Sequence, residues 1–108
     1  MQVERYTDGG RVAVLYSPGF GGGWSTWADD EYAETLLFDK RLVQAALDQI
    51  SRAEVEELLQ DILGDVYVYT GGWPVAVGWV SKGDIVIIDE YDGSESVTTK
   101  YKIVGYTA

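Results

Sequence analysis

The sequence contains neither cysteine nor histidine among its 108 residues. Without cysteine the chain has no disulfide bond and no thiol nucleophile, and without histidine it has no imidazole base. Ordinary zinc, iron and copper sites also depend on these two residue types. We therefore expect no metal site and no cofactor, although hard cations bound through carboxylates remain open.

Basic residues are scarce: eight Lys and Arg stand against 18 Asp and Glu, which gives a formal net charge of -10. The imbalance is concentrated in residues 28–65, which hold eleven acidic and three basic residues. An acidic surface repels nucleic acid at long range and attracts basic partners. We expect no direct nucleic-acid binding over this acidic helical face. A solvated face that only keeps the protein soluble is the alternative.

Long apolar runs are also missing, since none approaches the roughly 20 residues that span a bilayer. The first residues lack the charged and apolar regions of a secretory signal. We therefore expect a cytoplasmic protein that does not contact a membrane. Apolar residues make up 46% of the chain, which is enough for one modest core. We predict a single domain over residues 1–108.

Two segments in the middle of the chain show the three-and-four spacing of apolar residues that is typical of amphipathic helices. The first covers residues 39–50. The second covers residues 51–63, where Ser51 and Glu54 have the spacing of a capping box. Residues 29–37 are acidic but have too short an apolar pattern, so the sequence predicts one or two helical turns there at most.

Elsewhere the apolar pattern has a period of two or is continuous, and glycine-rich turns separate the runs. This predicts five strands, over residues 11–16, 66–69, 75–80, 85–89 and 97–104. The first is apolar on both faces, which indicates an interior strand. The order of elements favours an α+β fold with a mainly antiparallel sheet of about five strands and a two-helix layer on one face.

The most informative stretch is a glycine-rich, aromatic loop that follows the first strand. Its candidate binding residues are Ser17, Phe20, Gly21, Gly22, Gly23, Trp24, Ser25, Thr26 and Trp27. Successive amides in such a loop can point into one concavity and bind phosphate or carboxylate, while aromatic rings stack on a base. A Walker loop needs a lysine after its last glycine, and neither a dinucleotide fingerprint nor a nucleophile elbow fits. A purely structural loop, in which glycines allow tight packing, stays open.

A second candidate segment is the acidic turn at residues 89–96. It holds four carboxylates in seven residues, of which Glu90, Asp92 and Glu95 are candidate binding residues. Clustered carboxylates can bind a hard cation or act as acid and base, but their spacing here does not match a calcium loop. A tight hairpin turn at Asp92 and Gly93 explains the same residues without a function.

Four tryptophans and eight tyrosines exceed what a core of this size can hold, so some must reach the surface. Exposed Trp and Tyr commonly anchor protein interfaces. We expect Trp24 to be partly exposed, because the three glycines and Ser25 beside it offer little to bury the indole. We also expect the loop and the acidic turn to be neighbours, at the ends of strands in one sheet.

Three parts of the chain resemble small uncharacterised proteins encoded by bacteriophages and prophages. They are YSPGFG with GWSTW at residues 16–27, LFDKRLV at residues 37–43 and EYDGSE at residues 90–95, whereas VSKGD at residues 80–84 departs from those proteins. Small acidic phage proteins often bind host proteins. The resemblance therefore implies an accessory protein that shuts off a host defence system or redirects a host enzyme in the bacterial cytoplasm.

Together these features predict a non-enzymatic phage-type protein that binds a host protein through the loop and the acidic surface. One alternative is sequestration of a small nucleotide-type ligand by the loop, which the net charge opposes. Another is a small enzyme in which Asp89, Glu90 or Glu95 acts as acid or base or holds a divalent cation. We assign no catalytic residue, and a homo-oligomer is compatible with each hypothesis.

Overall fold

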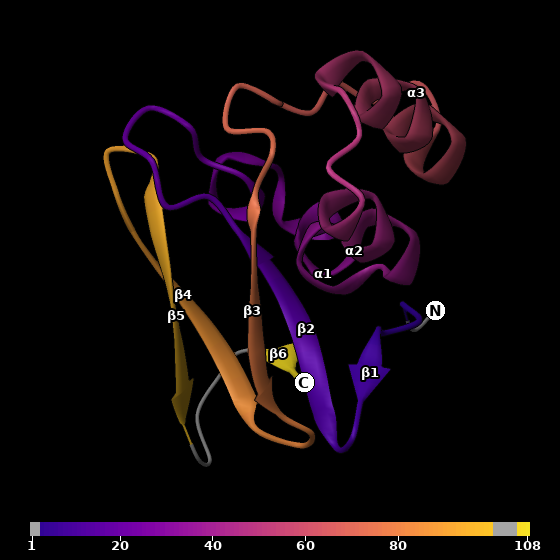
Figure 1. Ribbon diagram of the computed structural model, residues 1–108. Helices are drawn as coiled ribbons and strands as arrows, with labels where there is room; N and C mark the ends of the chain where they lie inside the picture. The colour runs from indigo at the N-terminus through magenta and orange to yellow at the C-terminus, as the bar shows by residue number, and fades with distance from the viewer. Residues whose placement is uncertain (1–2, 101–105) are drawn as a thin grey trace.

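A computed structural model describes residues 3–100 and 106–108. The chain has the predicted α+β architecture, shown in Figure 1. Its elements are β1 (Thr7–Asp8), β2 (Arg11–Tyr16), the 3-10 helix η1 (Ser25–Trp27), α1 (Asp30–Phe38), α2 (Lys40–Leu47), α3 (Arg52–Leu63), β3 (Ala76–Ser81), β4 (Ile85–Tyr91), β5 (Ser94–Lys100) and β6 (Tyr106–Thr107).

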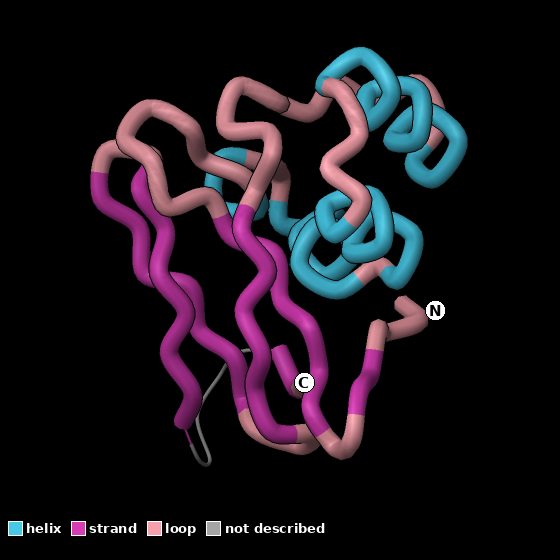
Figure 2. The backbone as a smooth tube through the Cα atoms, viewed as in Figure 1, coloured by secondary structure: helices cyan, strands magenta, loops and turns pink. Residues whose placement is uncertain are grey.

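The strands form two antiparallel three-stranded sheets, one in the order β1-β2-β3 and the other in the order β5-β4-β6. Figures 1 and 2 show three layers: the helices, the first sheet and the second sheet. Strand β2 lies in the middle layer. Its Ala13 and Leu15 pack with the helices, while Val12 and Val14 pack in a second cluster with residues of the other sheet. Burial on both faces explains the unbroken apolar run and confirms β2 as an interior strand.

The helix boundaries follow the capping residues of the sequence. Asp39 caps α2, and its side chain accepts a hydrogen bond from the amide of Arg41 at 2.8 Å. Ser51 and Glu54 form the predicted capping box of α3. The Ser51 amide bound to Glu54 lowers the pKa of that carboxyl group. Gly64 ends the helix with a φ of 80°, a conformation that glycine adopts without a steric penalty.

The structure differs from the predicted elements in several places. The antiparallel strands are divided between two sheets, and the acidic segment predicted to form one or two helical turns at most forms a third helix, α1. Residues 66–69 form no strand, because this extended segment buries Val68 in the helical cluster and pairs with no strand. The strand predicted over residues 97–104 is confirmed over residues 97–100 by β5, which begins earlier, at Ser94, and residues 101–104 lie outside the described residues.

Helix α3 packs mainly on α2, in the outermost part of the helical layer. Val55 and Leu59 are buried, whereas Leu58 and Ile62 are half-buried. The apolar stripe of α3 predicts that all four side chains are buried against the sheet, and this prediction is wrong for Leu58 and Ile62. In the part of the chain that the structure describes, none of the helices is long and apolar enough to cross a membrane.

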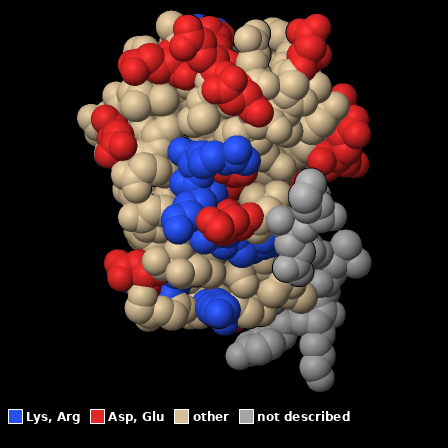
Figure 3. Space-filling view, turned by 90° about the vertical axis from the view of Figure 1, so that its right-hand side faces the viewer, with Lys and Arg blue, Asp and Glu red and all other residues tan. Residues whose placement is uncertain are grey.

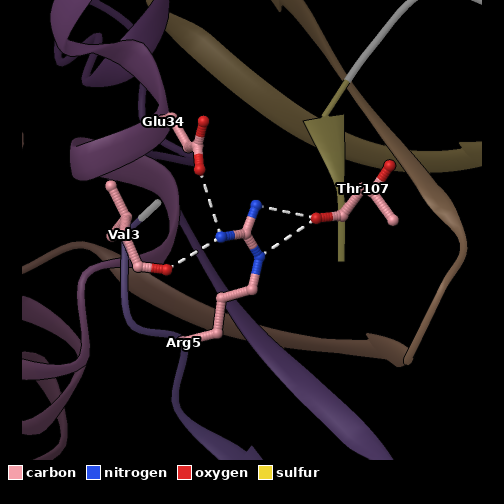
Figure 4. A network of polar contacts seen from close by, with 4 residues as sticks. All are labelled: Val3, Arg5, Glu34 and Thr107. Carbon is pink, nitrogen blue, oxygen red and sulfur yellow. Dashed lines mark hydrogen bonds and ion pairs between the residues drawn. The ribbon is translucent and has the colours of Figure 1, made fainter. Parts of the chain in front are cut away.

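The N-terminal segment is fixed to both the helices and the second sheet by Arg5, as Figure 4 shows. The guanidinium group donates to the carbonyl of Val3 at 2.9 Å, to the carboxylate of Glu34 at 3.2 Å and twice to the carbonyl of Thr107, at 2.8 and 3.0 Å. It also lies 4.1 Å from the centre of the Phe38 ring, within cation–π range. Arg5 thus joins α1 to β6. This contact lies on the side of the molecule where β1 is the edge strand of the first sheet and β6 is the edge strand of the second.

Leu59→Ala should lower the free energy of unfolding by about 2–5 kcal/mol, because it removes a buried side chain and leaves a cavity. Gln60→Ala is the control: Gln60 is the next residue of α3 and is exposed, so its loss should change stability by about 0.5 kcal/mol or less. Chemical denaturation measures both. Unchanged stability of the Leu59→Ala variant would contradict this packing of α3.

Candidate functional site

The glycine-rich loop and the acidic turn are in direct contact, at the end of the sheets where β2 ends and β4 turns into β5 (Figure 1). The amide of Glu95 donates to the carbonyl of Ser17, and the amide of Gly21 donates to the carbonyl of Asp92, both at 2.6 Å. The hydroxyl of Ser94 donates to the carbonyl of Pro18 at 2.8 Å. The predicted proximity is therefore confirmed, although the strands that carry the two segments belong to different sheets.

The side chain of Glu95 holds the loop in place from inside. It is only 2% exposed, and its Oε1 accepts a hydrogen bond from the amide of Ser17 at 2.9 Å. Its Oε2 accepts from the amides of Trp24 and Thr26, at 2.9 and 3.1 Å, and from the hydroxyl of Thr26. A buried carboxylate is tolerated only where such donors replace its lost hydration. All four donors are neutral and all come from the loop.

The predicted anion cradle therefore exists, but the anion in it is the protein's own Glu95. The amides of Ser17, Trp24 and Thr26 all point to this carboxylate. Two further loop amides donate to backbone carbonyls, that of Gly21 to Asp92 and that of Gly22 to Gly19. These groups are thus already satisfied without a bound phosphate.

The prediction that Trp24 is partly exposed is wrong, since this side chain is only 1% exposed. Its indole Nε1 donates to the carbonyl of Leu36 at 2.7 Å, and its ring centre lies 5.8 Å from that of Trp73. The glycines do not push the indole outward. They let the chain fold back on itself, because a Cβ on Gly23 would lie 2.3 Å from the Trp27 ring and one on Gly22 would lie 2.9 Å from Gly72.

Other aromatic side chains of the two segments do reach the surface. Phe20 and Tyr91 are 73% and 77% exposed, and their rings meet edge to face with centres 6.3 Å apart. Trp27 is 43% exposed and its ring centre lies 5.2 Å from that of Tyr69. The hydroxyl of Tyr69 donates to the carbonyl of Gly21 at 2.9 Å, which fixes that ring to the loop.

The acidic turn is a tight hairpin whose exposed carboxylates lie beside these rings. Asp92 and Gly93 have φ values of 49° and 83°, as in the type I′ turn that suits a two-residue hairpin. The Oε2 atom of Glu90 accepts from the amide of Gly93 at 2.7 Å and from the indole of Trp27 at 3.3 Å. A Cβ on Gly93 would lie 2.8 Å from the amide nitrogens of Gly21 and Gly22, so only glycine allows the turn to approach the loop this closely.

We call this surface the aromatic–acidic patch and define it by Phe20, Trp27, Tyr69, Glu90, Tyr91 and Asp92. Six of the predicted residues are buried beneath it: Ser17, Gly22, Gly23, Trp24, Ser25 and Glu95. Sequence reasoning did not assign Tyr69 and Tyr91 to the site. Tyr91 was recognisable, because it directly precedes the two-residue turn, but the sequence carries no signal that brings Tyr69 to the loop.

The four carboxylates that the sequence places together have different surroundings, although Glu90 and Glu95 are direct cross-strand partners of β4 and β5. Asp89, Glu90 and Asp92 are exposed, whereas Glu95 points into the loop. Asp89 accepts a hydrogen bond from the hydroxyl of Thr98 at 3.1 Å. Over residues 3–100 and 106–108, no group of three or more acidic side chains is arranged to hold a metal ion.

The charges of the molecule are unevenly distributed over its surface. Figure 3 shows Lys and Arg gathered in the middle of one face of the molecule, with Asp and Glu around them. Three basic residues form ion pairs: Arg5 with Glu34 at 3.2 Å, Lys40 with Glu4 at 3.8 Å and Arg41 with Asp39 at 2.9 Å. The loop and the acidic turn contain no basic residue at all, so the aromatic–acidic patch favours cations.

Comparisons of the chain with protein-family models, with curated proteins and with solved structures found no match. The resemblance to bacteriophage and prophage proteins is therefore not tested by these comparisons and stays a prediction.

Glu95→Gln should lower the free energy of unfolding by about 2–5 kcal/mol, because an amide nitrogen replaces an acceptor and leaves buried donors without a partner. Glu90→Gln is the matched control: the same change at an exposed residue of the same hairpin should cost less than about 1 kcal/mol. Urea denaturation of the two variants and the parent measures the difference. Equal effects of the two substitutions would disprove the supporting role of Glu95.

Proposed function

We propose that this chain is a non-enzymatic accessory protein of the phage type that binds a host protein through the aromatic–acidic patch. The observation that carries the proposal is the exposure of Phe20 and Tyr91 on a loop and a hairpin whose backbones are held together by hydrogen bonds. We further propose that this binding takes place in the bacterial cytoplasm and inhibits or redirects the host protein, for example one of a defence system.

The rigidity of the patch favours recognition of another protein. Exposed aromatic side chains bind best where their positions are fixed in advance, since less conformational entropy is then lost on association. Here Trp27 contacts Tyr69 and bonds to Glu90, while Glu95 holds the backbone of the loop beneath them. Large, fixed aromatic rings of this kind are the usual hot spots of protein interfaces.

The chemistry of the patch favours a basic surface on the partner. An arginine guanidinium can stack on an aromatic face and pair with a carboxylate at the same time. Glu90 and Asp92 are exposed directly beside Trp27 and Tyr91. The net charge of -10 adds long-range attraction, which speeds association with a basic partner.

Two observations weigh against the alternatives. Sequestration of a nucleotide by the loop would need free amides, but those of Ser17, Trp24 and Thr26 are bound to Glu95. An enzyme that uses Glu95 would need this carboxylate to reach a substrate, and it is buried among four hydrogen-bond donors of the loop. Protein binding requires neither of these groups to be free.

The double substitution Phe20→Ser with Tyr91→Ser tests the proposal. The parent chain, immobilised and exposed to bacterial lysate, should retain a partner that is then purified for calorimetric titration. The double variant should bind this partner roughly 30-fold or more weakly, as expected for the loss of hot-spot residues. Its melting temperature should stay close to that of the parent, because both side chains are exposed.

Tyr67→Ser is the matched control, because Tyr67 is equally exposed but lies beside the C-terminal half of α3. This variant should bind the partner as tightly as the parent does. Equal affinities of the double variant and the parent, or an equal loss in the Tyr67 control, would reject the aromatic–acidic patch as the binding surface.

A further inference from the structure

The two sheets leave a pair of strand edges unpaired on the side opposite β1 and β6. Among the described residues, β3 pairs only with β2 and β5 pairs only with β4. A groove of about 570 Å³ lies between these two edges and is lined by residues of both strands. The groove is separate from the aromatic–acidic patch, since it contains none of the six residues that define the patch.

The alternation of hydrogen-bonded and non-hydrogen-bonded residues along β3 shows which of its backbone groups face away from β2. The amide of Lys82 donates to the carbonyl of Gly10, which makes these two residues a hydrogen-bonded pair. Because such pairs alternate along an antiparallel ladder, Val80 and Gly78 also bond to β2. The amide and carbonyl groups of Trp79 and the amide of Ser81 therefore point to the free edge, and both residues line the groove. The carbonyl of Ser81 already accepts a hydrogen bond from the amide of Asp84 at 3.1 Å.

The same reasoning applies to β5. Tyr91 and Ser94 close the two-residue hairpin as a hydrogen-bonded pair, so Ser96 and Thr98 bond to β4 while Glu95, Val97 and Thr99 face outward. The amide of Glu95 confirms that this residue faces away from β4, because it donates to the carbonyl of Ser17. One outward residue of β5 is thus already used by the loop, whereas both outward residues of β3 that line the groove, Trp79 and Ser81, remain outside any strand pairing.

We infer that this groove binds an extended segment of a partner protein, which adds to the free edge of β3 as an antiparallel strand. Unpaired strand edges are templates for such additions, in which backbone bonds give affinity and side-chain pockets give specificity. Val80 and Val97 line the groove and favour small apolar side chains on one face of the segment. This site is independent of the proposed function.

Charge selects a basic segment over a second copy of this chain. Among the residues whose side chains the structure describes, Asp84 is the only charged one that lines the groove, and it lies just past the C-terminal end of β3. An antiparallel segment places its N-terminal residue at that end, so a lysine or arginine there meets Asp84. A second copy carries the same net charge of -10 and is repelled.

The test uses the full chain labelled with nitrogen-15 and the probe peptide acetyl-Lys-Thr-Val-Thr-Val-Thr-amide, in which the lysine and both valines lie on one face of the strand. The peptide should shift the amide signals of Trp79 and Ser81 and slow their hydrogen exchange. A peptide with glutamate in place of lysine should bind more weakly, and Asp84→Asn should remove this preference. The double variant Phe20→Ser with Tyr91→Ser should bind the probe as tightly as the parent does. A failure of the proposed patch function and a failure of the groove proposal are therefore distinguishable.

Ser81→Pro removes one outward amide without removing a bond to β2, because proline is tolerated where its nitrogen faces the edge. It should weaken probe binding about fivefold, the value of one hydrogen bond. The inference is overturned if no shift appears at about 1 mM peptide, or if the shifts fall on the aromatic–acidic patch instead. Protection of the Trp79 amide that rises with protein concentration without peptide would also overturn it, since the edge would then belong to a second copy.

Discussion

The buried carboxylate of Glu95 is the interaction on which the arrangement of loop and turn depends. A charge in the interior carries a desolvation cost that only several well-placed donors can offset. Glu95 finds them on Ser17, Trp24 and Thr26, which span almost the whole loop. One side chain from the β4–β5 hairpin therefore determines the path of the segment that joins β2 to α1.

The glycines and the aromatic residues follow from this constraint. Because the loop is drawn onto the hairpin, Gly22, Gly23 and Gly93 lie where a Cβ would collide with backbone or with the Trp27 ring. The fold-back buries Trp24 in the core and leaves Phe20, Trp27 and Tyr91 at the surface. The same interaction that stabilises the loop thus presents the rings that we propose as a binding surface.

Local signals predicted much of the fold. The capping box at Ser51 and the apolar run of β2 act through neighbouring residues, so the sequence shows them directly. The separation into two sheets and the burial of Trp24 depend on contacts between distant segments, which periodicity does not encode. Glu95 was recognised as unusual only because of its acidic neighbours. The inward direction of its side chain follows from the alternation of residues along the strand after the turn. Its role in holding the loop is not visible locally, because its bonding partner Trp24 lies 71 residues earlier in the sequence.

Hydrogen exchange of the backbone amides of Trp24 and Thr26 tests this account most directly. If Glu95 holds these amides in the folded state, they should exchange only when the whole protein unfolds, as slowly as the amides that pair β2 with β3. Exchange of both at the rate of an exposed loop, while the strand amides remain protected, would contradict the account. It would show that the carboxylate does not hold the loop.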